Sequence, residues 1–133
     1  MARPRTEHPT PAELEILHVL WARGSGTVRE IKEALEAKRP RAYTTVMSLV
    51  NLMADKGLLR CRRDGRAYVY TPRVRRETTL RHIVGDVVDR AFDGSAAALV
   101  ARLLDHAAPD RKELDEIHRI IGRYRRNKTR GKP

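Results

Sequence analysis

Apolar residues in the first half of the chain recur every three or four positions, in three runs that predict three helices. The first run follows Thr10-Pro11-Ala12-Glu13, in which Thr is a preferred cap, Pro suits the first helical position and Glu closes a capping box. Thr27 with Glu30 repeats the box before the second run, and the third run begins near Tyr43-Thr44. The inward positions of the three runs are Leu14, Leu17, Leu20 and Trp21; Val28, Ile31 and Leu35; and Val46, Leu49, Val50 and Met53.

The pattern changes to the alternation of strands after Lys56-Gly57, a basic last turn followed by a glycine cap. Residues 58–63 and 66–70 predict two short strands, and Asp64-Gly65 between them supplies the positive φ angles of a type I′ hairpin turn. Three helices followed by a hairpin predict a winged helix-turn-helix domain over residues 10–72. Two strands are too few for a sandwich or a barrel.

Residues 73–133 are helical by pattern, with interruptions at Asp93-Gly94-Ser95, where Ser95 caps the next helix, and at Pro109, where the last helix begins. Three short amphipathic helices make a small core alone, so their broad apolar faces predict a homodimerisation region over residues 73–126. The expected dimer contacts are Leu80, Ile83, Val84, Val87, Leu99, Leu103, Ile117, Ile120 and Ile121. Residues 1–9 indicate a flexible arm, and residues 127–133 a basic tail. The end of the chain from Arg123 to Pro133 is basic and is expected to fray. The expected fold is therefore mainly α with a small β-hairpin wing.

The composition of the chain indicates what kind of partner it binds. The chain has 133 residues with 28 Lys and Arg against 17 Asp and Glu, a formal net charge of +11, which favours a polyanion such as DNA. Hydrophobic residues make up 41%, which is enough for a folded core. A single cysteine, Cys61, excludes an intrachain disulfide and a Cys-rich zinc cluster. The absence of a long apolar run and of an apolar segment after Met1 predicts a cytoplasmic protein.

The third helix presents a short polar face that suits the major groove of DNA. Its outward positions are Thr44, Thr45, Met47, Ser48 and Asn51, with Tyr43 at the N-terminus, where its hydroxyl can meet a phosphate. In this set Asn can pair with adenine, and Met can contact a thymine methyl group. The alternative is that Tyr43 packs in the core and Thr44 is only the helix cap.

The hairpin tip carries Arg62, Arg63 and Arg66, which predicts contacts with phosphates or entry into the minor groove. The alternative is a charged, solvated edge that prevents sheet aggregation. Two pairs on helix faces, His82 with Asp86 and Asp115 with His118, lack the further ligands that a metal site needs. Without nucleotide-binding or nucleophile-elbow motifs either, we expect no enzyme, no metal and no cofactor. The basic tail also lacks the Phe or Trp anchors of a membrane-surface helix.

Five segments in order resemble the penicillinase-repressor family of BlaI/MecI type. They are Leu20-Trp21-Ala22-Arg23-Gly24, Thr27-Val28-Arg29-Glu30-Ile31, Ala42-Tyr43-Thr44-Thr45-Val46-Met47, Lys56-Gly57-Leu58-Leu59 and Gly65-Arg66-Ala67-Tyr68-Val69-Tyr70-Thr71-Pro72. The resemblance implies a homodimeric repressor that binds a palindromic operator, often with TACA/TGTA half-sites, and controls β-lactamase or related stress genes. The family positions that match Thr44, Met47, Ser48 and Asn51 lie on the operator-facing helix.

The resemblance also implies how repression ends. In antibiotic-responsive members a sensor-linked protease cuts within a motif N-G-x-F-x-S-L-V, which matches residues 93–100 here and places the cut between Ser95 and Ala96. Ala96 replaces the Phe of that motif, so release by a ligand stays open. The Cys-x-Cys pairs of the copper-responsive branch are absent, which excludes thiolate metal sensing of that kind. A rival function, favoured by the net charge and by a third helix without Arg, is a non-specific architectural nucleic-acid-binding protein.

Overall fold

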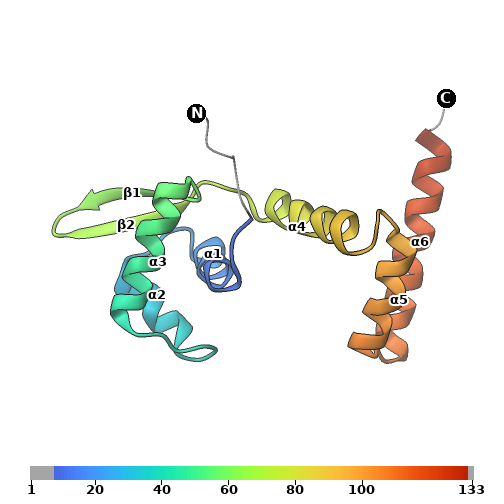
Figure 1. The fold of residues 1–133 in the computed structure, drawn as a ribbon, viewed down its shortest axis with the longest axis horizontal. Helices are drawn as coiled ribbons and strands as arrows, with labels where there is room; N and C mark the ends of the chain where they lie inside the picture. Colours follow the sequence, from blue (N-terminus) through green and yellow to red (C-terminus); the bar gives the residue numbers. More distant parts are fainter. Residues whose placement is uncertain (1–7, 132–133) are drawn as a thin grey trace. The chain divides into compact units, whose positions relative to one another are not determined.

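The computed structural model describes residues 8–131, which form six helices and one antiparallel hairpin (Figure 1). In chain order these are α1 (Pro11–Arg23), α2 (Val28–Leu35), α3 (Tyr43–Lys56), β1 (Leu59–Asp64), β2 (Ala67–Pro72), α4 (Arg76–Ala91), α5 (Ala96–Ala107) and α6 (Arg111–Gly131). The mainly helical class with a hairpin wing is confirmed. The chain divides into two compact units, an N-terminal one that ends at Gly85 and a C-terminal one that begins at Asp86. Of the expected N-terminal arm, residues 1–7 lie outside the described residues.

Local side-chain signals fix the bounds of the first helices. The Thr10 hydroxyl accepts a hydrogen bond from the Glu13 amide at 3.2 Å, and the Glu13 carboxylate accepts one from the Thr10 amide at 3.0 Å. Thr27 and Glu30 repeat this arrangement at 3.1 and 2.9 Å, so both expected capping boxes are confirmed. Gly57 ends α3 with a φ of 87°, a conformation that glycine adopts without steric cost.

The core of the N-terminal unit lies where α1, α2, α3 and the hairpin meet. Its buried members are Ile16, Leu17, Leu20, Val28, Ile31, Leu35, Val46, Val50, Met53, Leu58, Leu59 and Tyr70. On α3 the expected inward residues Val46, Val50 and Met53 have no exposed surface, and Leu49 packs partly buried against them. Each such side chain contributes about 1.5–3 kcal/mol on burial, which holds α3 with its opposite face outward.

The hairpin turn lies one residue later than the sequence pattern predicts. Leu59 pairs with Pro72 and Asp64 with Ala67, so Gly65 and Arg66 are the two central residues. Gly65 has a φ of 68°, whereas Arg66 has no left-handed φ. This is the arrangement of a type II′ turn, in which only the first central position needs glycine, so the expected type I′ turn centred on Asp64-Gly65 is wrong.

Two long-range contacts anchor the hairpin to the helices. Gly26, between α1 and α2, pairs with Tyr70 through two backbone hydrogen bonds of 3.0 and 2.8 Å and so adds a single bridge to the sheet. The indole N–H of Trp21 donates to the carbonyl oxygen of Val74 at 2.9 Å, just after β2. The direction in which the hairpin leaves the helices is therefore fixed by backbone pairing as well as by the core.

The C-terminal helices follow the expected order with two differences. Ser95 caps α5 as predicted, because its hydroxyl accepts a hydrogen bond from the Ala98 amide at 3.0 Å. The last helix begins at Arg111 and not at Pro109, because the Asp110 carboxylate accepts from the Glu113 amide at 2.9 Å and so caps it. This helix runs to Gly131, so residues 127–131 of the expected basic tail are helical in the structure. Basic side chains are favourable in a last helical turn, which accounts for the extension.

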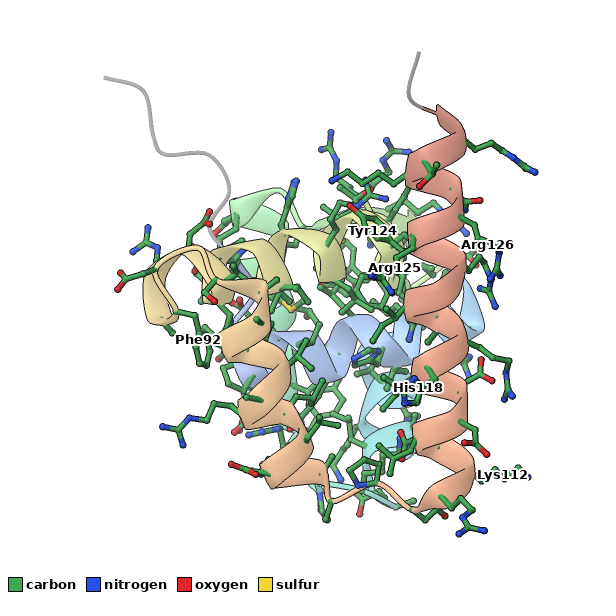
Figure 2. The ribbon with its side chains drawn as sticks, turned by 90° about the vertical axis from the view of Figure 1, so that its right-hand side faces the viewer. Phe92, Lys112, His118, Tyr124, Arg125 and Arg126 are labelled. Carbon is green, nitrogen blue, oxygen red and sulfur yellow. The ribbon has the colours of Figure 1, made fainter. Side chains whose placement is uncertain are left out.

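No side chain of α5 or α6 is fully buried between residues 96 and 130. In Figure 2, Lys112 and Arg126 extend from the side of α6 that faces away from α5. Large apolar side chains of both helices are also exposed to solvent, namely Val100, Leu103, Leu114, Ile120, Ile121 and Tyr124. Within residues 86–130, the C-terminal unit thus encloses no core of its own.

Candidate nucleic-acid interface

The outward face of α3 carries the side chains that the sequence analysis assigned to DNA. Those side chains are Tyr43, Thr44, Thr45, Met47, Ser48 and Asn51, and all of them are exposed. The alternative roles of the first two do not hold: Tyr43 is 44% exposed and is no core residue. Ala42 rather than Thr44 is the N-cap, and no side chain caps this helix. The backbone N–H groups at the start of α3 therefore have no side-chain acceptor, which suits a phosphate.

The hairpin tip holds its three arginines in the open. Arg63 lies over the ring of its cross-strand partner Tyr68, with 5.7 Å between the guanidinium carbon and the ring centre. Its Nε also donates to the Gly65 carbonyl oxygen at 3.3 Å. Within residues 8–131, Arg62 and Arg66 make no ion pair, so their charge is available to an anion.

The α3 face contains a hollow of about 460 Å³ between α3 and the hairpin. It is separate from a groove of about 550 Å³ elsewhere on the N-terminal unit. The hollow is lined by Thr27, Val28, Arg29, Tyr43, Met47, Asn51, Arg66, Ala67, Tyr68 and Tyr70. The structure therefore brings four of the predicted residues together, namely Tyr43, Met47, Asn51 and Arg66. The other five lie exposed outside it: Thr44, Thr45, Ser48, Arg62 and Arg63.

Arg29 and Tyr68 lie in this hollow and were missed by the sequence analysis. Arg29 is exposed in the first turn of α2, the helix that crosses the DNA backbone in helix-turn-helix proteins. Its outward position in the helical pattern was the signal that could have found it. Tyr68 is half exposed on β2, and its place beside α3 depends on the strand register, which no local signal gives.

Asn51 is oriented by a buried tyrosine from the hairpin. The Tyr70 hydroxyl donates to the Asn51 side-chain oxygen at 3.4 Å. Burial and then a hydrogen bond with Cys61 raise the pKa of Tyr70 to about 12, so the phenol keeps its proton. The oxygen end of the Asn51 amide thus faces Tyr70, and its Nδ2 donors remain for an acceptor on a base edge.

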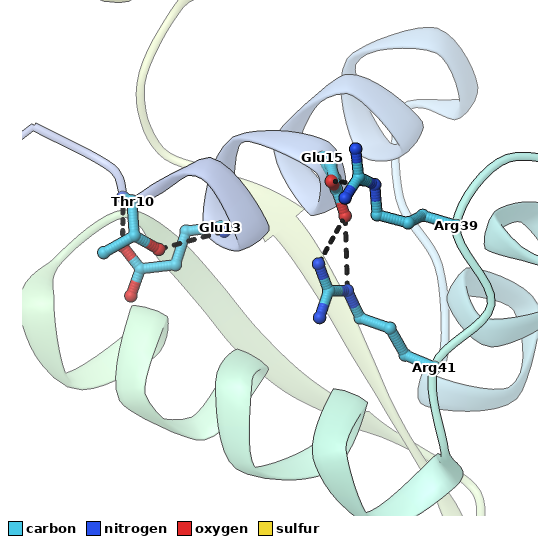
Figure 3. Close-up of polar contacts among 5 residues, drawn as sticks. All are labelled: Thr10, Glu13, Glu15, Arg39 and Arg41. Atoms are coloured by element: carbon cyan, nitrogen blue, oxygen red, sulfur yellow. Dashed lines mark hydrogen bonds and ion pairs between the residues drawn. The ribbon is translucent and has the colours of Figure 1, made fainter.

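Part of the positive charge that the sequence concentrates in residues 38–66 is neutralised inside the domain. The Lys56 ammonium donates to both oxygens of the buried Glu13 carboxylate at 2.9 and 3.0 Å. Arg39 and Arg41 converge on Glu15 at 3.2 and 3.0 Å (Figure 3). The bases of this window that stay without an ion pair within residues 8–131 are Lys38, Arg60, Arg62, Arg63 and Arg66. Four of these five bases lie on the hairpin, from Arg60 to Arg66.

The other candidate features belong to other parts of the chain. Ser95 and Ala96 are exposed at the start of α5, directly after Asp93 and Gly94, which have left-handed φ angles of 48° and 81°. Across residues 8–131, no cluster of three or more His, Cys, Asp and Glu residues is arranged to hold a metal ion. No helix in the same range is long and apolar enough to cross a membrane.

The family model described as penicillinase repressor matches residues 9–123. The chain belongs to this family. It is a transcriptional regulator of the winged-helix type and not an enzyme, as the sequence predicts.

Two relatives agree with this membership, and one solved structure shares the fold. The transcriptional regulator BlaI of Mycobacterium tuberculosis is 34% identical over 111 residues, which covers 82% of this chain and 79% of the relative. The penicillinase repressor of Bacillus licheniformis is 23% identical over 117 residues, covering 88% and 91%. In fold, the chain is similar to the YusO protein of Bacillus subtilis, with a TM-score of 0.54 at 19% identity over 89% of this chain and 75% of the other.

Proposed function

We propose that the chain is a homodimeric, sequence-specific repressor that inserts α3 into the major groove of its operator. The observation that carries this proposal is the exposed polar face of α3 beside a hairpin whose tip has three exposed arginines. A second helix of a helix-turn-helix enters the major groove with its first turns on base edges. Short hydroxyl and amide side chains at these positions can pair with bases without steric conflict.

Separate parts of the face take separate roles in this proposal. Met47, Ser48 and Asn51, on the middle of α3, contact base edges, together with Thr44. Tyr43 and Thr45 at the start of the helix bind phosphates, since its amide groups also point outward there. The hairpin arginines Arg62, Arg63 and Arg66 contact the flanking backbone or the minor groove. Arg29 on α2 adds a further backbone contact.

The C-terminal helices hold the partner subunit. Their support is the apolar surface that the C-terminal unit leaves open. Among the proposed dimer contacts, the exposed ones are Val84, Val87, Leu103, Ile120 and Ile121, and the partly exposed ones are Leu80, Ile83, Leu99 and Ile117. A twofold dimer with two identical heads requires a palindromic operator with half-sites about one helical turn, roughly 10 base pairs, apart or slightly more.

The controlled genes in this proposal encode β-lactamase or related stress functions, on the strength of family membership. A sensor-linked protease ends repression by cutting between Ser95 and Ala96. Support for this position comes from its exposure at a helix start after two left-handed residues. Cleavage there separates the DNA-binding head from α5 and α6, which removes most of the proposed dimer surface.

A competition gel shift tests sequence-specific binding. Labelled palindromic duplex with TACA/TGTA half-sites is challenged with unlabelled copies of itself and with random duplex of equal length and base composition. The expected preference is at least about 10³-fold for the palindrome. A smaller ratio supports a non-specific architectural role, which the net charge of +11 and the lack of a free cation on the first turns of α3 favour. No binding even at low salt would leave only a protein-interaction role for the winged helix.

A further inference from the structure

The groove of about 550 Å³ between α1 and the end of α2 belongs to no part of the proposed DNA face. Its lining consists of Glu15, His18, Val19, Ala22, Arg23, Ala34, Leu35, Lys38 and Arg39. None of these residues lines the hollow beside α3, and the volume is typical of small-molecule sites. We propose that this groove binds a small organic carboxylate with a compact apolar body.

The walls of the groove suit an apolar body. Two of the lining residues are apolar and largely withdrawn from solvent, since Leu35 is only 2% exposed and Val19 is half-buried. Ala22 on α1 and Ala34 on α2 are the smallest side chains of the lining, and they leave space for a ligand. A ring of six carbons covers such a surface and gains about 25 cal/mol for each Å² of apolar area removed from water.

The rim of the groove suits an anion. Lys38 and Arg39 stand at one end, and within residues 8–131 Lys38 has no ion pair. Arg39 is 69% exposed and makes a single contact with Glu15 at 3.2 Å, a kind of surface pair that contributes little free energy. Glu15 keeps its second cation when Arg39 leaves, since Arg41 donates to it from both Nε and a terminal nitrogen (Figure 3).

A ligand carboxylate can therefore form ion pairs with Lys38 and Arg39 without leaving the Glu15 carboxylate unpaired. Arg23 at the other end is occupied, because it donates to the Ser25 carbonyl oxygen and pairs with Glu30 at 3.2 Å. The expected orientation of the ligand is thus with its carboxylate toward Lys38 and its apolar body along α1.

The chain carries its own reporter for this site. Its single tryptophan, Trp21, lies edge-on to the ring of His18, with 5.3 Å between ring centres, and His18 lines the groove. A ligand that displaces or polarises the imidazole alters the surroundings of the indole. Binding is consequently measurable by tryptophan emission on the whole protein, without DNA and without a label.

The first test compares cyclohexanecarboxylate with its neutral isostere cyclohexanecarboxamide, both of which lack absorbance that would interfere with the tryptophan. The carboxylate is expected to change the emission saturably with a Kd below about 10 mM, and the amide to bind roughly tenfold or more weakly. No saturable change with the carboxylate, or equal affinity for the two compounds, overturns the proposal.

Matched variants locate the site. Ala34→Leu fills the groove and should abolish binding, whereas Ala37→Leu makes the same change just outside the lining and should leave the Kd within about twofold. Lys38→Ala should weaken carboxylate binding about tenfold, and Lys112→Ala, which removes a charge from α6, should not. If Ala37→Leu acts like Ala34→Leu, or Lys38→Ala leaves the Kd unchanged, the carboxylate does not occupy this groove.

Thermal unfolding followed by circular dichroism shows that each variant is folded before its Kd is compared. The proposal is independent of the proposed function, because the assay contains no DNA. Failure of carboxylate binding leaves operator recognition untouched, and failure of operator recognition leaves the groove as a ligand site.

Discussion

Replacing Arg63 and Asn51 separately should distinguish backbone contacts from base contacts. Arg63→Ala removes the guanidinium that lies over Tyr68 at the hairpin tip. Each lost phosphate contact lowers the slope of log K against log salt concentration by about 0.9, so a dimer with two hairpins should lose about 1.8. Because phosphates carry no sequence, operator and random duplex should lose affinity alike.

Asn51→Ala should have the opposite signature. The Asn51 side chain is exposed on α3, and its oxygen accepts a hydrogen bond from Tyr70. Its Nδ2 N–H groups therefore remain as donors to a base edge. Its loss should cost about 1–3 kcal/mol of discrimination in each half-site and leave the salt slope unchanged. Tyr70→Phe, which removes only the orienting hydroxyl, should reduce the same preference by a smaller amount.

Fluorescence anisotropy of labelled operator and random duplex between about 50 and 200 mM salt measures both quantities. Lys112→Ala serves as the charge control, since Lys112 lies on α6 and is not among the residues proposed to contact DNA. Equal losses on operator and random duplex for Asn51→Ala would refute its base contact. An unchanged slope for Arg63→Ala would refute the hairpin contact, and a change of about 0.9 would indicate that one hairpin of the dimer engages.

Three further predictions address stability and assembly. Lys56→Met leaves the buried Glu13 carboxylate without its cation and should lower the free energy of unfolding by about 3 kcal/mol. Urea titrations followed by tryptophan emission measure this loss, and a loss under about 1 kcal/mol would contradict the contribution of the buried pair. Leu103→Glu places a charge on the exposed apolar face of α5 and should give monomers in sedimentation equilibrium, whereas an unchanged dimer mass rejects this interface. The backbone hydrogen bond from Thr27, followed by the charge of Arg23, lowers the pKa of Glu30. The ionised carboxylate therefore stabilises the fold above its unfolded pKa of about 4.3, and this contribution disappears as pH falls through the folded pKa. Glu30→Gln should flatten the pH dependence of stability in that range, and an unchanged profile would show that Glu30 does not contribute to it.

The sequence predicts the parts of the fold that depend on neighbours along the chain. The boxes at Thr10 and Thr27 are set by residues three positions apart, and α3 ends at a glycine that follows a basic last turn. The hairpin turn was misplaced because Asp64-Gly65 is a local signal, while the register depends on Leu59 lying opposite Pro72. Strand pairing decided between two adjacent positions that local preference alone could not separate.

The candidate site divides in the same way. The outward positions of α3 follow from the helical period, and the structure exposes all of them. The hollow beside α3 depends on residues from other elements, so Arg29 and Tyr68 could not be placed there from local pattern. The count of basic residues also overstated the free charge, because Glu13 and Glu15 on α1 reach Lys56 and Arg41 over 43 and 26 positions of sequence.

Tyr70 has a consequence for how such a regulator can diversify. Its backbone pairs with Gly26 and its hydroxyl holds Asn51, so it anchors the base of the hairpin and the amide on α3 together. The turn at Gly65 lies beyond this anchor. Under the proposed function, mutations or length changes at the tip alter the affinity for any duplex without disturbing the preference for particular bases. Affinity and target choice thereby become traits that selection can adjust one at a time.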